Sequence, residues 1–374
     1  MFEIVKHTKF SLDANGDGGC KRSLQIHELL ERCGLNVTNE SLDLPKNLSL
    51  SNKISLFLKG FSLTKKSFPI KGLHSIRKII ETSKYMGLRQ SVLEKYKNKD
   101  IIFINENTTP NAFGLPYLIK DANKCAKTVC LPHNLETFCG ETDYLSGKKS
   151  PQWLYEEANR MGMYDQVFCI SKEEVWLLEM LGVKANYLPY YPPKEIEERL
   201  LCLREKRKQF QRKEGKKYLL LGSATNTPTK QGMVVLLKNF REQPTIDFEL
   251  HIAGYGTECL KAFEHSKFVF HGSINKEELE RLLIESDALV IYQPATSGAL
   301  TRIVESLIVG VPIFANMNAA RDYHGVNGII EYNSMSDLFC KLSDTRCVDM
   351  PEIPKRNEYA ENFFVDTIKG FTKQ

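Results

Sequence analysis

The 374-residue sequence lacks the patterns that mark several common classes of protein. Its ten cysteines include no C-x-x-C pair and no cluster with histidines at metal-ligand spacing, which argues against a structural zinc site. No signal peptide precedes these cysteines, so we expect reduced thiols in a cytoplasmic protein. No apolar run approaches the length of a bilayer-spanning helix. Any association with a membrane is therefore expected to be peripheral.

Two binding motifs are also missing. Neither half of the chain contains G-x-G-x-x-G followed by an acidic residue at the ribose distance, which counts against a hydride-transferring dehydrogenase. There is no Asp-x-Asp pair and no group of histidines and carboxylates at metal-ligand spacing. We therefore expect neither a bound metal nor a cofactor.

The residues that are present describe an ordinary globular protein. Hydrophobic residues make up 42% and charged residues 26% of the chain, as in typical soluble domains. A chain of this length is too long for one small core, so we expect two domains. The net charge of +5 is unevenly distributed, because residues 194–217 alone contain ten Lys or Arg against five Glu.

A second basic segment, residues 44–80, holds eight Lys or Arg and no acidic residue. Phe57, Phe61 and Phe68 are interleaved with its lysines. Two interpretations are open: the segment lies on a membrane surface, or it is a solvated face whose aromatic rings pack inward. Basic surfaces also attract phosphate-bearing acceptors, whereas we do not expect nucleic acid as a partner.

Short apolar runs alternate with helical patterns along the whole chain. In the first half we expect strands at residues 2–8, 100–105, 127–131 and 165–170, with a helix from about residue 21 to residue 33. In the second half we expect strands at residues 218–221, 248–253, 268–270, 289–291 and 311–315, with helices between them. Such alternation predicts parallel α/β sheets.

A proline-rich stretch at residues 186–193, NYLPYYPP, divides the chain. We therefore predict an α/β protein with two Rossmann-like domains, residues 1–192 and 193–354, whose parallel sheets face each other across a cleft. Residues 355–374 are expected to form a C-terminal helix that packs back on the N-terminal domain. The cleft between two such domains is the default ligand site.

Two features of the first half lie where parallel sheets hold their ligands. A glycine-rich loop containing Gly18 and Gly19 follows the first strand. It is either a backbone that approaches a ligand or a mobile surface turn. His133 follows a later strand, in the run PHNLE. Taken alone, it is either a reactive group or a loop histidine satisfied by backbone.

Residues 288–316 carry the strongest functional pattern. A buried strand opens the stretch, and apolar residues resume at helical spacing from Leu300. Residues 296–299 between them are small, so a ligand can approach the backbone and the first N–H groups of the helix are free to attract an anion. Arg302 and Glu305 lie three apart on the polar side of this helix. There a cation suits a phosphate and a carboxylate suits a pair of sugar hydroxyls.

On these residues the second half resembles the donor domain of the GT-B glycosyltransferases, in particular glycosyltransferase group 1, or family four. The resemblance is close over residues 217–332 and covers the first 190 residues in outline. FELHIAGYG is similar to the family's strand and glycine turn, and FVFHGSINKEELERLLIESDALVIYQP to its next strand, helix and strand. Glu305, followed by Gly310 and Pro312, matches the nucleotide-ribose carboxylate of the family's E-A-M-x-x-G-x-P run.

The sequence also departs from the family pattern. Many members have two glutamates in an E-x7-E pattern, and Ser297 occupies the first of these positions. Arg302 fits a variant that has small residues there and a Lys or Arg three before the remaining glutamate. The usual arginine after the first donor-domain strand is absent from GSATNTPTKQG, which offers Ser223, Thr225 and Lys230 instead. The resemblance therefore implies that Arg302 neutralises the distal phosphate, with Lys230 as the second candidate.

The resemblance implies a nucleotide-sugar site between the two domains. Arg302 and His133 would be catalytic, Arg302 by stabilising charge on the departing phosphate and His133 by hydrogen bonding to the reacting sugar or to the acceptor. Glu305 would fix the ribose. The remaining donor-binding residues implied by the resemblance are Ser297, Gly298, Ala299, Leu300, Lys230, Gly222, Ser223, Gly254, Gly18 and Gly19.

The implied reaction moves a sugar from a nucleotide sugar, UDP- or GDP-linked, to a glycan, lipid-linked or other acceptor. Arg302 and the helix N-terminus at residues 298–300 would stabilise the departing phosphate without a metal. The resemblance implies that the anomeric configuration is retained. Closure of the two domains would exclude water and favour transfer over hydrolysis. Two other functions are open: a sugar-nucleotide epimerase with a similar pair of domains, and a non-catalytic chain that partners another transferase.

Overall fold

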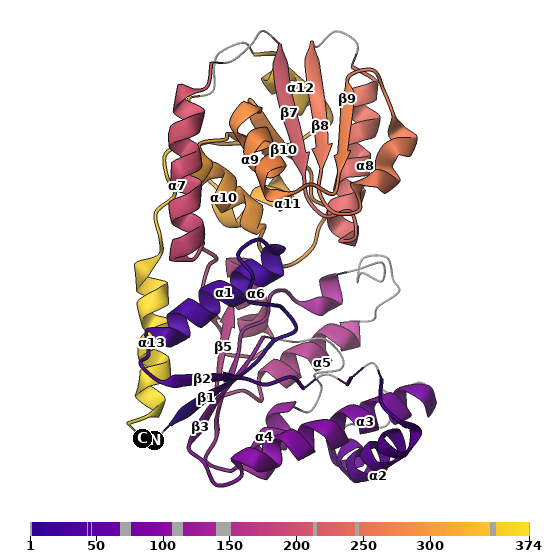
Figure 1. The fold of residues 1–374 in the computed structure, drawn as a ribbon, viewed down its shortest axis with the longest axis vertical. Helices are drawn as coiled ribbons and strands as arrows, with labels where there is room; N and C mark the ends of the chain where they lie inside the picture. The colour runs from indigo at the N-terminus through magenta and orange to yellow at the C-terminus, as the bar shows by residue number, and fades with distance from the viewer. Residues whose placement is uncertain are drawn as a thin grey trace.

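A computed structural model describes residues 2–42, 44–45, 47–67, 76–106, 115–139, 151–211, 215–243, 247–344 and 349–373. This part of the chain forms two parallel sheets of six strands, one from each half of the sequence, with helices packed against them (Figure 1). The predicted α/β architecture of two parallel sheets is therefore confirmed.

The first sheet has the strand order β2-β1-β3-β4-β5-β6, and every pair is parallel. Its central strands are apolar and buried, as parallel strands covered on both faces must be. The order doubles back between β1 and β3, and open sheets of this kind bind ligands where the order reverses. The strands are β1 (Glu3–His7), β2 (Asn36–Asn39), β3 (Ile101–Asn105), β4 (Lys127–Cys130), β5 (Gln166–Cys169) and β6 (Asn186–Tyr187).

Helices α2 and α3 form a hairpin beside the first sheet (Figure 1). A Cβ on Gly60 would lie 1.8 Å from the Ser83 carbonyl oxygen, and one on Gly87 would lie 2.1 Å from the Leu56 carbonyl oxygen. Glycine at both positions therefore allows the close approach of the two helices. The helices of this half are α1 (Gly18–Glu31), α2 (Leu50–Ser67), α3 (Ile76–Leu93), η2 (Glu94–Tyr96), α4 (Leu115–Ala122), η4 (Glu136–Phe138), α5 (Pro151–Met161) and α6 (Lys172–Met180).

The second sheet has the strand order β12-β11-β10-β7-β8-β9, again fully parallel. The order reverses between β10 and β7, and helix α10 follows directly after β10 at this switch point. The strands are β7 (Lys216–Leu221), β8 (Phe248–Ala253), β9 (Phe268–Gly272), β10 (Ala288–Ile291), β11 (Ile313–Asn316) and β12 (Ile329–Tyr332). The helices are α7 (Lys194–Gln209), α8 (Thr227–Arg241), η5 (Thr257–Phe263), α9 (Lys276–Glu285), α10 (Thr301–Val309), α11 (Met317–Ala320), η6 (Arg321–Tyr323), α12 (Met335–Ser343) and α13 (Glu358–Phe371).

The last helix, α13, returns to the first half of the molecule, beside α1 (Figure 1). The ring of Phe364 meets Phe168 of β5 edge-on, with centroids 5.0 Å apart, and Ile368 and Phe371 are buried in the same core. The predicted domain boundaries stay predictions, but the chain clearly crosses between the two halves twice. One crossing follows β6 and the other precedes α13.

Arg356 links the two crossings. The guanidinium of Arg356 lies over the ring of Tyr191, 5.3 Å from its centroid. The same group forms ion pairs with Glu28 of α1 at 3.0 Å and with Glu197 of α7 at 3.5 Å. The segments that connect the halves therefore run side by side.

Some elements differ from those predicted from the sequence. Helix α1 begins at Gly18, so Gly18 and Gly19 lie in its first turn rather than in a loop. The cause is Asp17, whose carboxylate accepts a hydrogen bond from the Cys20 N–H and caps the helix. The short strands β2 and β6 were not predicted, because NVTN and NY contain too few apolar residues to stand out from a loop.

Candidate functional site

Helix α10 lies where the two halves of the molecule meet. Its residues from Ile303 to Val309 are all buried, so the polar side of the helix, on which the sequence places Glu305, is covered rather than exposed. The reason is that α7 and α1 both pack against this helix. The polar groups of α10 therefore face the junction between the halves rather than bulk solvent.

The guanidinium of Arg302 lies beside Gly222, and no described residue gives it an anionic partner. A Cβ on Gly222 would be 3.1 Å from Arg302 Nη1, which places the cation at the carboxyl end of β7. Among the described residues, none forms a hydrogen bond with the buried Nε of Arg302. Burial lowers the pKa of Arg302 to about 10, so the group is still a cation at neutral pH. A desolvated cation without a counter-charge strongly favours binding an anion.

Three predicted residues lie at the strand ends on this side of the second sheet. Gly222 and Ser223 follow β7, and Gly254 follows β8. A Cβ on Gly254 would lie 2.1 Å from the Gly222 carbonyl oxygen, so only glycine fits there. The hydroxyl of Ser223 lies 2.7 Å from that of Thr225, at the exposed rim. Lys230, near the start of α8, is exposed to solvent.

Both carboxylate oxygens of Glu305 are engaged by side chains of α1 and of the first crossing. Oε2 lies 2.6 Å from Lys21 Nζ of α1, and Oε1 accepts a 2.7 Å hydrogen bond from the Tyr190 hydroxyl. Each carboxylate oxygen has two acceptor positions. Lys21 and Tyr190 therefore orient the carboxylate and leave acceptor capacity for further hydroxyl groups.

The turn before α10 is tied to the first half of the molecule. The Ser297 hydroxyl donates to the Leu135 carbonyl oxygen at 3.0 Å and accepts from the Leu135 N–H at 2.9 Å. The Gly298 N–H, which was expected to be free for an anion, donates a 2.8 Å hydrogen bond to Glu174 of α6. A carboxylate of the chain itself therefore occupies one predicted anion position.

Helix α10 begins without a side-chain cap. Leu300 is its N-cap residue and, with Ala299, packs against the core of the second half. An uncapped helix N-terminus carries partial positive charge that favours an anion. A Cβ on Gly18 would lie 2.7 Å from Thr301 Oγ1. The N-termini of α1 and α10 therefore face each other across the junction.

His133 belongs to a buried network of ionisable side chains that includes Glu106 and Lys6. Its Nε2 lies 3.2 Å from Glu106 Oε2, and Glu106 Oε1 lies 2.7 Å from Lys6 Nζ. The ring of Phe10 stacks on the imidazole with centroids 4.4 Å apart. A Cβ on Gly19 would fall 2.2 Å from that phenyl ring. The first turn of α1, Phe10 and His133 thus form one packed arrangement.

The protonation states of Glu106 and His133 follow from their burial and from their ionic and hydrogen-bonded partners. Burial alone would raise the pKa of Glu106, but Lys6 and His133 outweigh it and lower the pKa to about 2. Burial lowers the pKa of His133, against the opposing effect of Glu106. Near neutral pH the histidine is therefore neutral. It donates its Nε2 proton to the Glu106 carboxylate and keeps Nδ1 as an acceptor.

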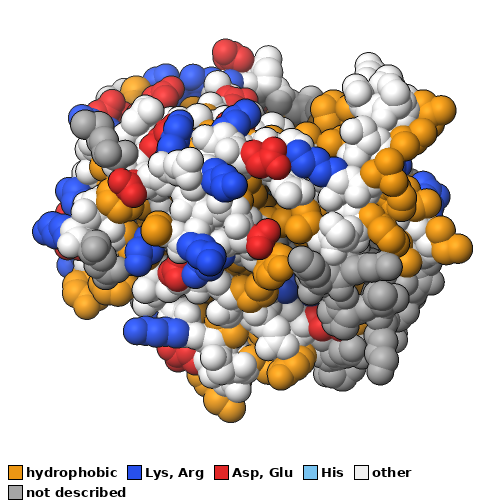
Figure 2. All heavy atoms as spheres, turned by 90° about the horizontal axis from the view of Figure 1, so that it is seen from below, with side chains coloured by type: hydrophobic (Ala, Val, Ile, Leu, Met, Phe, Trp, Pro, Cys, Tyr) orange, Lys and Arg blue, Asp and Glu red, His pale blue; other side chains and the backbone are white. Residues whose placement is uncertain are grey.

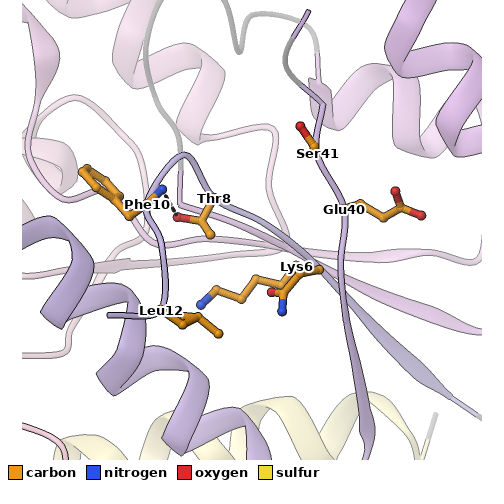
Figure 3. A pocket seen from close by; sticks show the side chains of 7 residues that line it. Lys6, Thr8, Phe10, Leu12, Glu40 and Ser41 are labelled. Atoms are coloured by element: carbon orange, nitrogen blue, oxygen red, sulfur yellow. Dashed lines mark hydrogen bonds between the residues drawn. The ribbon is translucent and has the colours of Figure 1, made fainter. Parts of the chain in front are cut away.

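A pocket of about 280 Å³ opens between the carboxyl ends of β1 and β2 (Figure 3). It borders on the histidine, because Phe10 lines it and also stacks on His133. A few polar groups beside an aromatic wall suit a small polar ligand. The lining residues are Lys6, Thr8, Phe10, Leu12, Asn39, Glu40 and Ser41.

A group of acidic residues also lies at the junction. Asp322 of η6 accepts a 3.2 Å hydrogen bond from the Lys172 N–H of α6. Burial, together with the adjacent Glu173, raises the pKa of Asp322 to about 8. Burial raises the pKa of Glu174 to about 7. The charge of this contact therefore changes near neutral pH.

The structure thus brings most of the predicted site residues to one junction, and adds others that the sequence analysis missed. Glu106 directly follows β3, and a carboxylate at the end of a parallel strand was a usable signal. Tyr190 was interpreted only as part of a proline-rich boundary. Lys6 gave no signal, because its partner is distant in the sequence. The residues missed are Lys6, Lys21, Glu106, Glu174 and Tyr190.

The described part of the chain shows neither a metal-binding cluster nor a membrane-spanning helix. Within it, no three or more His, Cys, Asp or Glu side chains are grouped as ligands for a metal ion. None of its helices combines the length and the apolar character that a membrane span requires. Helices α2 and α3, with 18 residues each, carry Lys and Arg along their length.

Comparison with known proteins identifies the fold. No family model and no curated protein matches the sequence, but solved structures match nearly the whole chain. The chain has the GT-B glycosyltransferase fold, as predicted.

Three of the matching structures illustrate the likeness. HepE of Anabaena, solved with UDP and glucose, has a TM-score of 0.57 at 13% identity, covering 98% of this chain and 97% of that one. A glycosyltransferase from Rickettsia africae has a TM-score of 0.59 at 15% identity, covering 100% and 96%. WaaG, a glycosyltransferase involved in lipopolysaccharide biosynthesis, has a TM-score of 0.57 at 13% identity, covering 97% and 95%.

Proposed function

We propose that the chain is a glycosyltransferase that moves a sugar from a nucleotide-sugar donor to a glycan, lipid-linked or other acceptor, in polysaccharide biosynthesis. The observation that carries the proposal is the buried guanidinium of Arg302, which has no anionic partner among the described residues and sits at the carboxyl end of β7. A diphosphate supplies the missing charge. HepE, which shares the fold, has been solved with UDP-glucose, and a UDP- or GDP-linked sugar is the proposed co-substrate.

The donor would lie along the second half of the junction. Gly222 and Gly254 leave room for the diphosphate to approach the backbone beside Arg302. The uncapped N-terminus of α10 adds partial positive charge. Glu305, held in place by Lys21 and Tyr190, would accept hydrogen bonds from the two ribose hydroxyls. Its role is to position the donor.

The acceptor would approach from the first half. His133, neutral and oriented by Glu106, would hydrogen-bond the reacting sugar or the acceptor hydroxyl through Nδ1. The pocket beside Phe10 is the proposed entrance for the acceptor. A contact between residues 44–80 and a membrane is also proposed, since it would bring a lipid-linked acceptor to this half.

The reaction breaks the bond between the anomeric carbon and the phosphate oxygen and joins that carbon to the acceptor oxygen, whose proton passes to the departing diphosphate. Negative charge develops on the departing diphosphate, and Arg302 stabilises it through a group that is already aligned. Transfer is proposed to need no metal and to retain the anomeric configuration, with Ser297 in place of the family's first glutamate. Residues 1–192 would bind the acceptor and residues 193–354 the donor.

Calorimetry with UDP-, GDP- and ADP-sugars tests the proposal. We expect one of them to bind, and we expect Arg302→Gln to reduce turnover by about 10²- to 10³-fold, the usual effect of removing one aligned charge stabiliser. Lys238→Gln is the matched control, because it removes an exposed cation farther along α8 that has no assigned role, and we expect it to leave turnover unchanged. Lys230→Gln tests the second candidate for the phosphate.

Three outcomes would contradict the proposal in different ways. Loss of turnover in Lys230→Gln alone would move the phosphate role to that residue. Failure of the wild-type chain to bind any nucleotide sugar would favour a non-catalytic partner protein. A changed sugar nucleotide formed without acceptor, detected by NMR, would identify an epimerase.

A further inference from the structure

The turn that leads into α10, residues 296–300, is bonded to several other segments of the chain. Near its start, the Thr296 hydroxyl donates a 3.2 Å hydrogen bond to the Phe138 carbonyl oxygen of the first half. At its end, the Leu300 carbonyl oxygen accepts a 3.4 Å hydrogen bond from the Tyr323 hydroxyl of η6. The turn is therefore fixed near both of its ends.

Gly298 lies in the middle of this turn. Its φ of 78° is in the left-handed region, which favours glycine. A Cβ at this position would lie 3.0 Å from the His133 carbonyl oxygen. The turn therefore places the segment that carries His133 next to the helix that carries Arg302.

Both polar backbone groups of Gly298 are held by charged side chains. Its N–H donates a 2.8 Å hydrogen bond to Glu174 Oε1 of α6, and its carbonyl oxygen accepts a hydrogen bond from Arg321 Nη2 of η6. Arg321 also donates to the Asn318 carbonyl oxygen at 2.5 Å, which orients the guanidinium. A carboxylate from the first half and a cation from the second half thus hold the same residue.

The carboxylate of Glu174 is in an unusual environment. On the face of the molecule seen from below, Figure 2 shows Asp and Glu side chains at the surface, interspersed with Lys and Arg. Glu174 is only 2% exposed, and its Oε2 forms no hydrogen bond with any described residue. Burial of an incompletely paired carboxylate costs free energy. Its location therefore indicates a role for the contact with Gly298.

Capping of helix α6 does not explain this burial. Ser171 and Glu174 have the S-x-x-E spacing of a capping box, and Ser171 Oγ accepts a 3.2 Å hydrogen bond from the Glu174 N–H. A capping glutamate can stay at the surface, however, and Glu173 already provides an exposed carboxylate in the first turn of this helix. The cap does not require a side chain that is buried against the other half of the molecule.

We propose that Glu174 is a positioning residue, which acts through Gly298 to fix the N-terminus of α10 against the segment that carries His133. Arg302 lies in the first turn of α10, so its place depends on the same contact. Because Glu174 is buried, it acts through the turn and does not touch the donor. The inference deepens the proposed function and rests on it for the ligand, a nucleoside diphosphate, whose binding requires closely aligned donors.

Amide hydrogen exchange of the full chain tests the contact without any ligand. With isotope-labelled glycine observed by NMR, Glu174→Ala should speed exchange of the Gly298 N–H at least about tenfold, because a hydrogen bond to a charged group is lost. Glu174→Gln should stay within about threefold of the wild type, since its amide oxygen still accepts this proton. The N–H of Gly310, which donates to the Leu307 carbonyl oxygen at the other end of α10, should not change.

Calorimetry with UDP and with GDP tests the consequence for the ligand. For the nucleotide that the wild-type chain binds, Glu174→Ala should raise the Kd about tenfold at unchanged stoichiometry, and Glu174→Gln should restore the affinity. A variant that was merely unfolded in part would lower the stoichiometry instead. Glu179→Gln is the matched control, because it removes an exposed carboxylate of the same helix. It should leave the Kd unchanged.

Other results would overturn the proposal. Equal acceleration at Gly298 and Gly310 in Glu174→Ala would mean that Glu174 only stabilises the fold. Unchanged exchange at Gly298 would mean that the contact does not hold the turn, and unchanged affinity despite faster exchange would mean that the turn does not serve the ligand. A wild-type chain that binds neither nucleotide would refute the proposed function, whereas the exchange of Gly298 would still decide whether Glu174 positions the turn.

Discussion

At the scale of single residues, the buried pair of Lys6 and Glu106 determines how His133 is presented. Both side chains are completely buried, so each loses its hydration and depends on the other. Lys6 also donates to the carbonyl and hydroxyl oxygens of Ser23 at 2.8 and 3.0 Å. The cation is thus fully coordinated, and the carboxylate stays ionised to accept the proton of His133.

Glu106→Gln should destabilise the chain by about 3–5 kcal/mol, because it leaves Lys6 buried without a counter-charge. Urea unfolding measures the loss. The control is Glu94→Gln, which removes a solvent-exposed partner of Lys59. It should cost less than about 1 kcal/mol. Equal unfolding midpoints for the two variants would show that Glu106 does not compensate Lys6.

The sequence could predict the site residues that form local patterns, but not those that pair across the chain. Arg302 and Glu305 lie one helical turn apart in a motif, so their common location could be predicted. The partners of Glu305 come from α1 and from the first crossing. No spacing in the sequence encodes such contacts, because the tertiary fold alone brings these segments together.

At the scale of elements, the α2–α3 hairpin depends on two glycines. Gly60→Ala would place its Cβ 1.8 Å from the Ser83 carbonyl oxygen, a backbone atom that can move only if the helices separate. We expect a loss of about 1–3 kcal/mol in the free energy of unfolding. Thermal or urea unfolding measures it.

A glycine in α13 is the control for this prediction. Gly370 has no atom within 4 Å of the position of an added Cβ. Gly370→Ala should therefore stabilise the chain by up to about 1 kcal/mol, through helix propensity alone. If Gly60→Ala were equally stabilising, the hairpin would not be as closely packed as described.

Strands β7 to β11 of the second half were predicted within two residues at each end, because each is an apolar run beside a glycine, proline or charged turn, whereas β12 was not predicted. The burial of α10 was not predicted. Its sequence shows an apolar face and a polar face, but α1 of the other half covers the polar one. Amphipathic patterns predict which face is apolar, and only the tertiary structure shows what covers the remaining face.

At the scale of the whole molecule, buried acidic groups make the stability of the contact between the two halves depend on pH. The pKa of Asp322 is raised to about 8 by burial and by Glu173, and that of Glu174 to about 7 by burial. Arg321 and Lys172 face the same contact and only partly offset these effects. A raised carboxyl pKa means that the contact is favoured by protonation. It should be strongest below about pH 4, weaken as the pH rises, and be weakest above about pH 8.

Small-angle X-ray scattering tests this dependence. The radius of gyration should be larger at about pH 9 than at about pH 6, as ionised carboxylates separate the halves. Glu174→Gln combined with Asp322→Asn removes both titrating groups. This variant should show one radius at both pH values, whereas a wild-type radius independent of pH would contradict the assignment.

The paired crossings held by Arg356 have a mechanical consequence. Two connecting segments that run side by side should allow the halves to open and close by a hinge motion. They should resist rotation of one half relative to the other about any other axis. A protease cut in either crossing would leave the halves connected by the other crossing. The nicked protein should therefore migrate as one particle until it is denatured. The path of the chain through the two crossings therefore determines the direction of the hinge motion, whether or not a ligand is bound.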